Sequence, residues 1–160
     1  MDVQVTVTEA TVDDVDEVLR LYRLLEEEMQ ALETMWNLDD ALAEPVGESL
    51  REAIDDPASH LLVGLIDGSA AGFILGRVRP LLPHTGESVG AIQLVFTEEP
   101  ARGVGVGEAT RNALLDRFRT AGITKFDAHV LPGHRMAKNF FEAAGFSARH
   151  IVMHHDDADD

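Results

Sequence analysis

The chain contains no cysteine among its 160 residues, which excludes disulfide bonds, thiolate metal sites and a cysteine nucleophile. A mechanism in which an acyl group rests on an enzyme thiol is therefore excluded as well. Long hydrophobic runs are also missing, since none approaches the roughly 20 residues of a transmembrane helix. The first ten residues, MDVQVTVTEA, lack the basic and apolar regions of a signal peptide. The sequence therefore predicts a cytoplasmic protein that does not act at a membrane.

Lysine is scarce, and negative charge dominates the sequence. Two lysines and eleven arginines stand against 29 acidic residues, and the formal net charge is −16. This balance argues against nucleic acid as a partner, because phosphates would be repelled over most of the surface. A basic substrate and a salt-adapted surface are both compatible with such a charge.

The length and the 45% hydrophobic content suit one compact domain, expected over residues 1–155, followed by an acidic disordered tail at 156–160. The periodic patterns predict an α/β fold of order β-α-α-β-β-β-α-β-α-β, with a mixed, mostly antiparallel sheet flanked by helices. Strands are expected at residues 3–8, 60–66, 70–78, 88–97, 125–131 and 147–155. Helices are expected from a Thr11 cap through Met29, at 48–55, from 108 to a point before Gly122, which is its C′ residue, and at 136–144.

Residues 92–118 are the most informative stretch, because they combine a strand, a glycine loop and a helix. The alternation of side chains along residues 92–97 predicts a strand with one apolar face, which carries Ile92, Leu94 and Phe96. The loop has glycine at every second position from 103 to 107 and leads into the first turn of the helix, where free N–H groups and the helix dipole favour an anion. This stretch therefore predicts a cradle for phosphate.

Two common nucleotide motifs do not match this loop. A Walker loop would continue from the last glycine into Lys and Ser or Thr, whereas Gly107 is followed by Glu108 and Ala109. A dinucleotide fingerprint needs a third glycine that is not in register here. The cradle must therefore be assigned by a different motif.

RGVGVG at residues 102–107 fits the pattern Arg/Gln-x-x-Gly-x-Gly/Ala, with Arg102, Gly105 and Gly107 on the fixed positions. A second block, AKNFFEAAGF at 137–146, looks like a late helix followed by Gly-Phe. Together these blocks resemble the GNAT superfamily of acyl-CoA-dependent N-acyltransferases. The resemblance covers residues 88–153 well and the first half only in its order of elements.

The resemblance implies an N-acetyltransferase that moves the acetyl group of acetyl-CoA directly to an amine acceptor in a ternary complex, without a metal. It implies that the loop amides hold the CoA pyrophosphate and that the pantetheine arm lies between two splayed strands. The residues expected to bind CoA are Val95, Thr97, Arg102, Gly103, Val104, Gly105, Val106, Gly107, His134 and Phe141.

The sequence departs from the family pattern at the positions expected to do proton chemistry. Phe141 occupies the place of a tyrosine that commonly acts as general acid, and His134 replaces an asparagine that often contacts CoA. His134 could substitute as acid or bond the CoA arm, or it could be a loop histidine exposed to water. The fourth strand offers Gln93 in place of a carboxylate base, and His129 is expected to be a buried, satisfied histidine. The catalytic residues are therefore unassigned.

Phe141 also favours an alternative from another class, an acyl-CoA-binding regulatory module with weakened catalysis. A third alternative is a nucleotide-binding protein with an atypical loop. The chain has one expected strand after its last helix where many relatives have two, so the last strand is either missing or supplied by a partner in a homodimer. Trp36 is expected either to wall the acceptor pocket or to cover the core.

Overall fold

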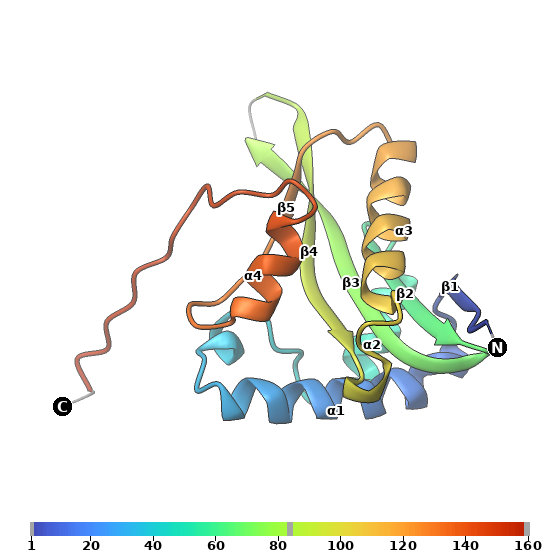
Figure 1. Cartoon of the computed structure of the whole chain (residues 1–160). Coiled ribbons are helices and arrows are strands. Elements are labelled where there is room, and N and C mark those ends of the chain that lie inside the picture. The colour runs from blue at the N-terminus through green and yellow to red at the C-terminus, as the bar shows by residue number, and fades with distance from the viewer. Residues whose placement is uncertain (1, 83–84, 159–160) are drawn as a thin grey trace.

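The structure, a computed structural model, describes residues 2–82 and 85–158 and contains one five-stranded sheet with its strands in chain order (Figure 1). The strands are β1 Val5–Glu9, β2 Ser59–Ile66, β3 Ser69–Leu82, β4 Glu87–Thr97 and β5 Phe126–Ala128. Strands β1 to β4 pair antiparallel, and β5 runs parallel to β4. The predicted mixed, mostly antiparallel sheet is therefore confirmed.

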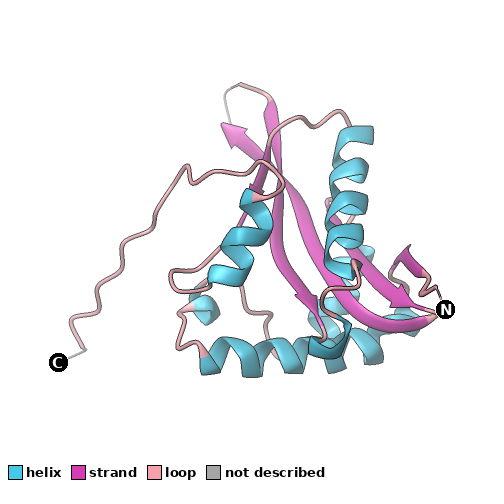
Figure 2. Ribbon diagram, viewed as in Figure 1, coloured by secondary structure: helices cyan, strands magenta, loops and turns pink. Residues whose placement is uncertain are grey.

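In the part of the chain that the structure describes, four α-helices flank the sheet (Figure 2). They are α1 Val15–Ala31, α2 Val46–Asp55, α3 Val106–Thr120 and α4 Arg135–Glu142, joined by short 3-10 turns η1 Val12–Asp14, η2 Trp36–Leu38 and η3 Glu99–Ala101. The predicted cap is present, because the Thr11 N–H donates to Asp14 Oδ2 at 2.8 Å in a capping box. Among the described residues, no helix is long and apolar enough to cross a membrane.

The sheet carries a separate hydrophobic cluster on each face. On one face, α1 and α2 pack through residues such as Leu21 and Leu50. On the other, α3 and α4 pack through residues such as Phe118 and Phe141. Each helix pair buries its apolar stripe against one side of the same strands, so the strands are buried on both sides.

Strand β4 contains a β-bulge at Gln93. Leu75 of β3 pairs with Leu94, whereas the next residue, Gly76, pairs with Ile92, so Gln93 is an extra residue in β4. Beyond the bulge the side-chain alternation inverts: Ile92 joins the α3/α4 cluster and Leu94 joins the α1/α2 cluster. The prediction that Ile92, Leu94 and Phe96 share one face is therefore wrong.

The predicted last strand, residues 147–155, is not part of the sheet. Residues 146–156 have no regular secondary structure, and the chain leads away from the sheet (Figure 1). Alternation alone does not make a strand, because a strand also needs a neighbour for its backbone N–H and C=O groups. The observed order is therefore β-α-α-β-β-β-α-β-α. Disorder of 156–160 stays a prediction, and 159–160 lie outside the described residues.

Helix α3 lies close to the sheet because glycines face it from three strands. A Cβ added at Gly64 would lie 2.6 Å from Val106 Cγ1, and one added at Gly76 would lie 2.8 Å from Leu114 Cδ2. At Gly90 the added atom would lie 2.6 Å from Phe118 Cγ. This close packing fixes the N-terminus of α3 relative to the end of β4.

We expect Gly90→Ala to lower the free energy of unfolding by about 1–3 kcal/mol, because the added methyl group overpacks against the ring of Phe118. Phe118 is fully buried and has no free space to move into. Urea unfolding measures the change. Gly47→Ala is the matched control: its added methyl lies 3.6 Å from Arg51 Nη1, an ordinary contact, and alanine favours the helix. Equal stability of the two variants would contradict the close-packing argument.

Candidate functional site

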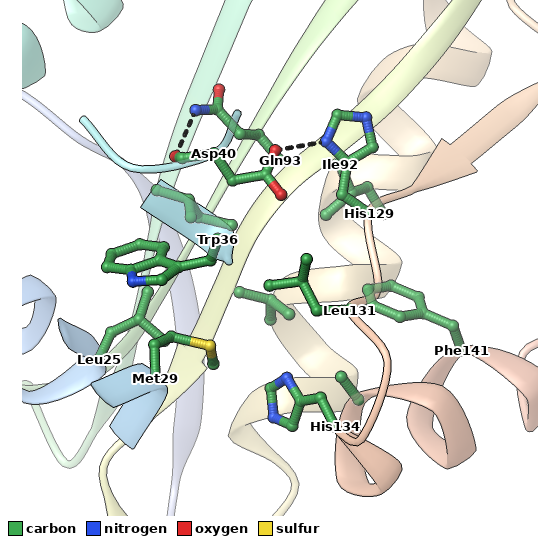
Figure 3. A pocket seen from close by; sticks show the side chains of 13 residues that line it. Leu25, Met29, Trp36, Asp40, Ile92, Gln93, His129, Leu131, His134 and Phe141 are labelled. Atoms are coloured by element: carbon green, nitrogen blue, oxygen red, sulfur yellow. Dashed lines mark hydrogen bonds and ion pairs between the residues drawn. The ribbon is translucent and has the colours of Figure 1, made fainter. Parts of the chain in front are cut away.

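A cleft opens where β4 and β5 part. Strand β5 pairs with β4 only from Gly90 to Ile92, and the last hydrogen bond between them runs from the His129 N–H to Ile92 O at 3.1 Å. Strand β4 continues to Thr97, while the chain beyond His129 turns toward α4. The residues that line the cleft are Leu25, Met29, Trp36, Asp40, Ile92, Gln93, Leu94, Val95, His129, Leu131, His134, Ala137 and Phe141 (Figure 3).

The glycine loop follows the end of β4 and leads into α3. Gly103 and Gly105 adopt the left-handed region, with φ of 87° and 103°, and a Cβ added at either would have nothing within 4 Å. The N–H of Ala109 donates to Gly105 O at 3.0 Å, so the N–H groups of the three preceding residues, 106–108, have no acceptor within the helix. The open space before the loop and its free N–H groups fit an anionic group such as a pyrophosphate.

The side chain of Arg102 turns away from that space. Its Nε donates to Thr97 O at 2.9 Å, and its Nη2 donates to Glu28 Oε1 at 2.8 Å. The guanidinium of Arg102 also lies over the ring of Phe96. The backbone N–H of Arg102 donates to Glu99 O at 3.1 Å. Arg102 therefore holds the loop against the end of β4 and against α1.

The other residues expected to bind CoA lie at the cleft or at the loop. Val95, His134 and Phe141 line the cleft together. Thr97 ends β4 beside the loop, with its Oγ1 3.4 Å from a Cβ added at Gly107. Val104 is exposed in the loop. The two sequence motifs meet directly, because a Cβ added at Gly107 would lie 3.3 Å from Phe140 Cε1.

His134 begins α4 and presents an unpaired nitrogen to the protein interior. Among the buried side-chain nitrogen and oxygen atoms of the described residues, His134 Nε2 has no hydrogen-bond partner. Burial lowers the pKa of His134; the Glu28 carboxylate opposes this shift and the Arg102 guanidinium adds to it. The ring is therefore neutral at pH 7 and can hydrogen-bond a ligand in the cleft.

Phe141 is 3% exposed and packs edge-on against both Phe140 and Phe146. Its position on the cleft wall is therefore apolar and supplies no proton. Trp36 packs against Tyr22 at 5.7 Å in the core and also lines the cleft, and its role in walling an acceptor pocket stays a prediction.

Sequence reasoning missed a hydrogen-bonded pair on the opposite side of the cleft. His129 Nδ1 lies 2.6 Å from Asp40 Oδ1, and Gln93 Nε2 donates to Asp40 O at 2.8 Å (Figure 3). The hydrogen bond to Asp40 raises the pKa of His129, and burial opposes this shift. His129 does have a partner, as expected, but the prediction that it is buried is wrong, because the residue is exposed and lines the cleft. The partners are 89 residues apart, and no local signal in the sequence connects them.

A second hollow adjoins the cleft at Gln93, on the side of α2. Its charged residues are Glu52, Asp56 and Arg77, of which Asp56 and Arg77 form an ion pair at 3.2 Å. The two hollows share Gln93 as a lining residue. Among the described residues, no group of three or more His, Asp or Glu side chains could hold a metal ion.

Comparison with solved structures shows the fold. The structure of a tetramutant of a Bacillus halodurans protein aligns with a TM-score of 0.79 and 21% identity, covering 94% of this chain and 99% of that one. An aminoglycoside antibiotic 6′-N-acetyltransferase from Acinetobacter baumannii aligns with a TM-score of 0.74 and 13% identity, covering 96% of this chain and 97% of that one. A ribosomal-protein-alanine N-acetyltransferase from Brucella melitensis biovar Abortus 2308 aligns with a TM-score of 0.72 and 18% identity, covering 95% of this chain and 98% of that one.

Comparison of sequences shows the family. L-2,4-diaminobutyric acid acetyltransferase of Nocardia farcinica is 34% identical over 82 residues, which are 51% of this chain and 40% of that protein. The match thus spans less than half of the relative's length. The model of the Acetyltransferase (GNAT) family matches residues 18–146, most of the chain. The chain therefore belongs to the GNAT family of acetyltransferases.

Proposed function

We propose that the protein is an N-acetyltransferase that transfers the acetyl group of acetyl-CoA to an amine in a ternary complex. The observation that carries this proposal is the continuity between the glycine loop and the cleft, with Thr97 beside Gly107 and Val95 further along the same strand. A long cosubstrate with an anionic end suits this arrangement. The absence of cysteine supports direct transfer, because no thiol is available to carry the acetyl group.

In this proposal the pyrophosphate lies against the backbone of residues 103–107, and Arg102 keeps that loop in position. The pantetheine arm runs along β4 past Val95 and Thr97, where the strand has lost its β5 neighbour. His134 Nε2 hydrogen-bonds a polar group of the arm, and Phe141 packs against it. The amine enters from the α2 side, where the cleft meets the second hollow. L-2,4-Diaminobutyrate, the substrate named for the Nocardia relative, is the first acceptor to test.

Phe141 favours a second candidate, an acyl-CoA-binding regulatory module with weakened catalysis. A phenyl ring cannot protonate a departing thiolate, and its surroundings are apolar. Release of CoA thiol in the presence of amines distinguishes the two candidates, since the module would bind acetyl-CoA without releasing thiol. A thiolate is a fair leaving group that water can protonate, which is why the enzyme is our first choice.

We further propose that the protein acts in the cytoplasm on a small amine, and not on nucleic acid or at a membrane. The net charge of −16 supports the exclusion of nucleic acid and membranes as partners, because it disfavours approach to polyanionic surfaces.

Gly105→Ala should weaken acetyl-CoA binding by roughly tenfold or more, which corresponds to about 1.4 kcal/mol, because alanine disfavours the left-handed conformation that shapes the loop. Calorimetric titration with acetyl-CoA measures this. Gly122→Ala is the matched control: Gly122 also has a left-handed φ, 85°, and open space around it, but it follows α3 at the far end. We expect both variants to lose similar stability and only Gly105→Ala to lose affinity. Failure of the unaltered protein to bind acetyl-CoA would refute the proposed function.

We also propose a homodimer formed through the segment after α4. Ile151, Val152 and Met153 are 72%, 72% and 87% exposed, and β5 is the last strand of the described sheet. An extended apolar segment and an open sheet edge can pair between two copies.

Light scattering should then give twice the chain mass of 17.5 kDa for the unaltered protein and the single-chain mass for Val152→Asp. A charge on this segment should oppose burial between copies. The control is Val12→Asp, which alters another exposed valine, 60% exposed, in η1. A monomeric unaltered protein at high concentration would count against the dimer.

A further inference from the structure

One titratable pair lies on the acceptor side of the cleft. Asp40, in the segment between η2 and α2, has a side chain that is only 10% exposed and lies 2.6 Å from His129 Nδ1. The side chain of His129 is 34% exposed, so its ring is accessible. A buried carboxylate behind an accessible imidazole is an arrangement suited to proton transfer.

The main chain holds both residues in place. The Asp40 N–H donates to Trp36 O at 2.8 Å, and Gln93 Nε2 donates to Asp40 O. The backbone N–H of His129 donates to the carbonyl oxygen of Ile92, which is the residue before the bulge. Because the carboxylate accepts the proton of Nδ1, the neutral ring carries its free lone pair on Nε2.

Charged groups from three elements influence His129. Asp40, from the segment before α2, and Asp127, from β5, both raise the pKa of His129, whereas Arg79 from β3 and burial lower it. Asp127 is itself paired with Arg149, whose Nε lies 2.7 Å from Asp127 Oδ1. The pKa of His129 is raised on balance, which favours a ring that can take up a proton near neutral pH.

We propose that His129 Nε2 accepts the proton of the acceptor's ammonium group and that Asp40 positions and stabilises the protonated ring. The inference rests on the proposed acetyl transfer and assigns the acceptor to the primary alkylamines. Such amines are protonated in neutral solution, so they cannot attack a thioester until a base has removed a proton.

The step balances as follows. One proton of the ammonium group passes to His129 Nε2, and the freed lone pair of the nitrogen attacks the thioester carbonyl carbon. The C–N bond forms, and the C–S bond breaks with its electron pair leaving on sulfur. The nitrogen loses its second proton as the amide forms, and the thiolate takes up that proton. The proton on His129 passes to water.

The experiment compares His129→Gln with the unaltered protein, using acetyl-CoA and a panel of primary alkylamines that includes L-2,4-diaminobutyrate. We expect kcat/KM for the amine to fall roughly 10²- to 10⁴-fold, with acetyl-CoA affinity unchanged. The deficit should shrink as the assay pH rises toward the pKa of the amine, because solution then supplies the free base. A merely structural role would give no such recovery.

Asp40→Asn provides a second readout. Because the Asp40 carboxylate raises the pKa of His129, its loss should move the acidic limb of the pH profile of kcat/KM to lower pH. His60→Gln is the control, since His60 is a half-buried histidine on β2 that packs against Phe118 and does not line the cleft. That variant should keep both the rate and the profile.

The outcomes separate this inference from the proposed function. Failure of the unaltered protein to bind acetyl-CoA overturns both. Binding without thiol release on any amine overturns the inference and favours the binding module. Transfer that His129→Gln retains in full, or a deficit that does not change with pH, overturns the inference and leaves the acetyltransferase in place.

Discussion

The extra residue in β4 is the constraint on which the cleft depends. A β-bulge bends its strand and increases the local twist, and here it occurs at Gln93, immediately after the last residue that β4 shares with β5. The bulge sends Ile92 and Leu94 to opposite faces and aims Gln93 at the carbonyl of Asp40. The parting of β4 from β5, the filling of both hydrophobic clusters and the hydrogen bond that supports Asp40 therefore all depend on this one position.

The proposed anion site is built from backbone, which suits a chain of net charge −16. Two arginines near α3 hold the structure together instead of facing open space. Arg102 pairs with Glu28. Arg111 is buried: its Nη1 donates to Phe140 O at 3.1 Å, and its guanidinium lies 4.6 Å from the centroid of the Phe140 ring. Free N–H groups at a helix N-terminus attract an anion without any basic side chain. The proposed phosphate cradle is thus compatible with an acidic surface.

Features encoded by neighbouring residues could be predicted from the sequence. The Thr11–Asp14 capping box, the hairpin of β2 and β3, and the glycine loop before α3 all depend on residues a few positions apart. Features that depend on a partner strand could not be predicted. The bulge at Gln93 is defined by its register with β3, and residues 147–155 alternate like a strand but have no neighbour in the described sheet. The Asp40–His129 pair joins segments 89 residues apart, so no local signal in the sequence links the two residues.

Three histidines show how surroundings assign different chemistry to the same side chain. Burial lowers the pKa of His60 and of His134, whereas the hydrogen bond to Asp40 raises the pKa of His129. His134 and His129 line the same cleft from different segments. A neutral ring on the α4 side suits hydrogen bonding to an uncharged arm, and a ring that can hold a proton suits the side on which an amine must lose one. The cleft therefore has two chemically different ends, and the proposed transfer from a thioester to an amine needs such a difference.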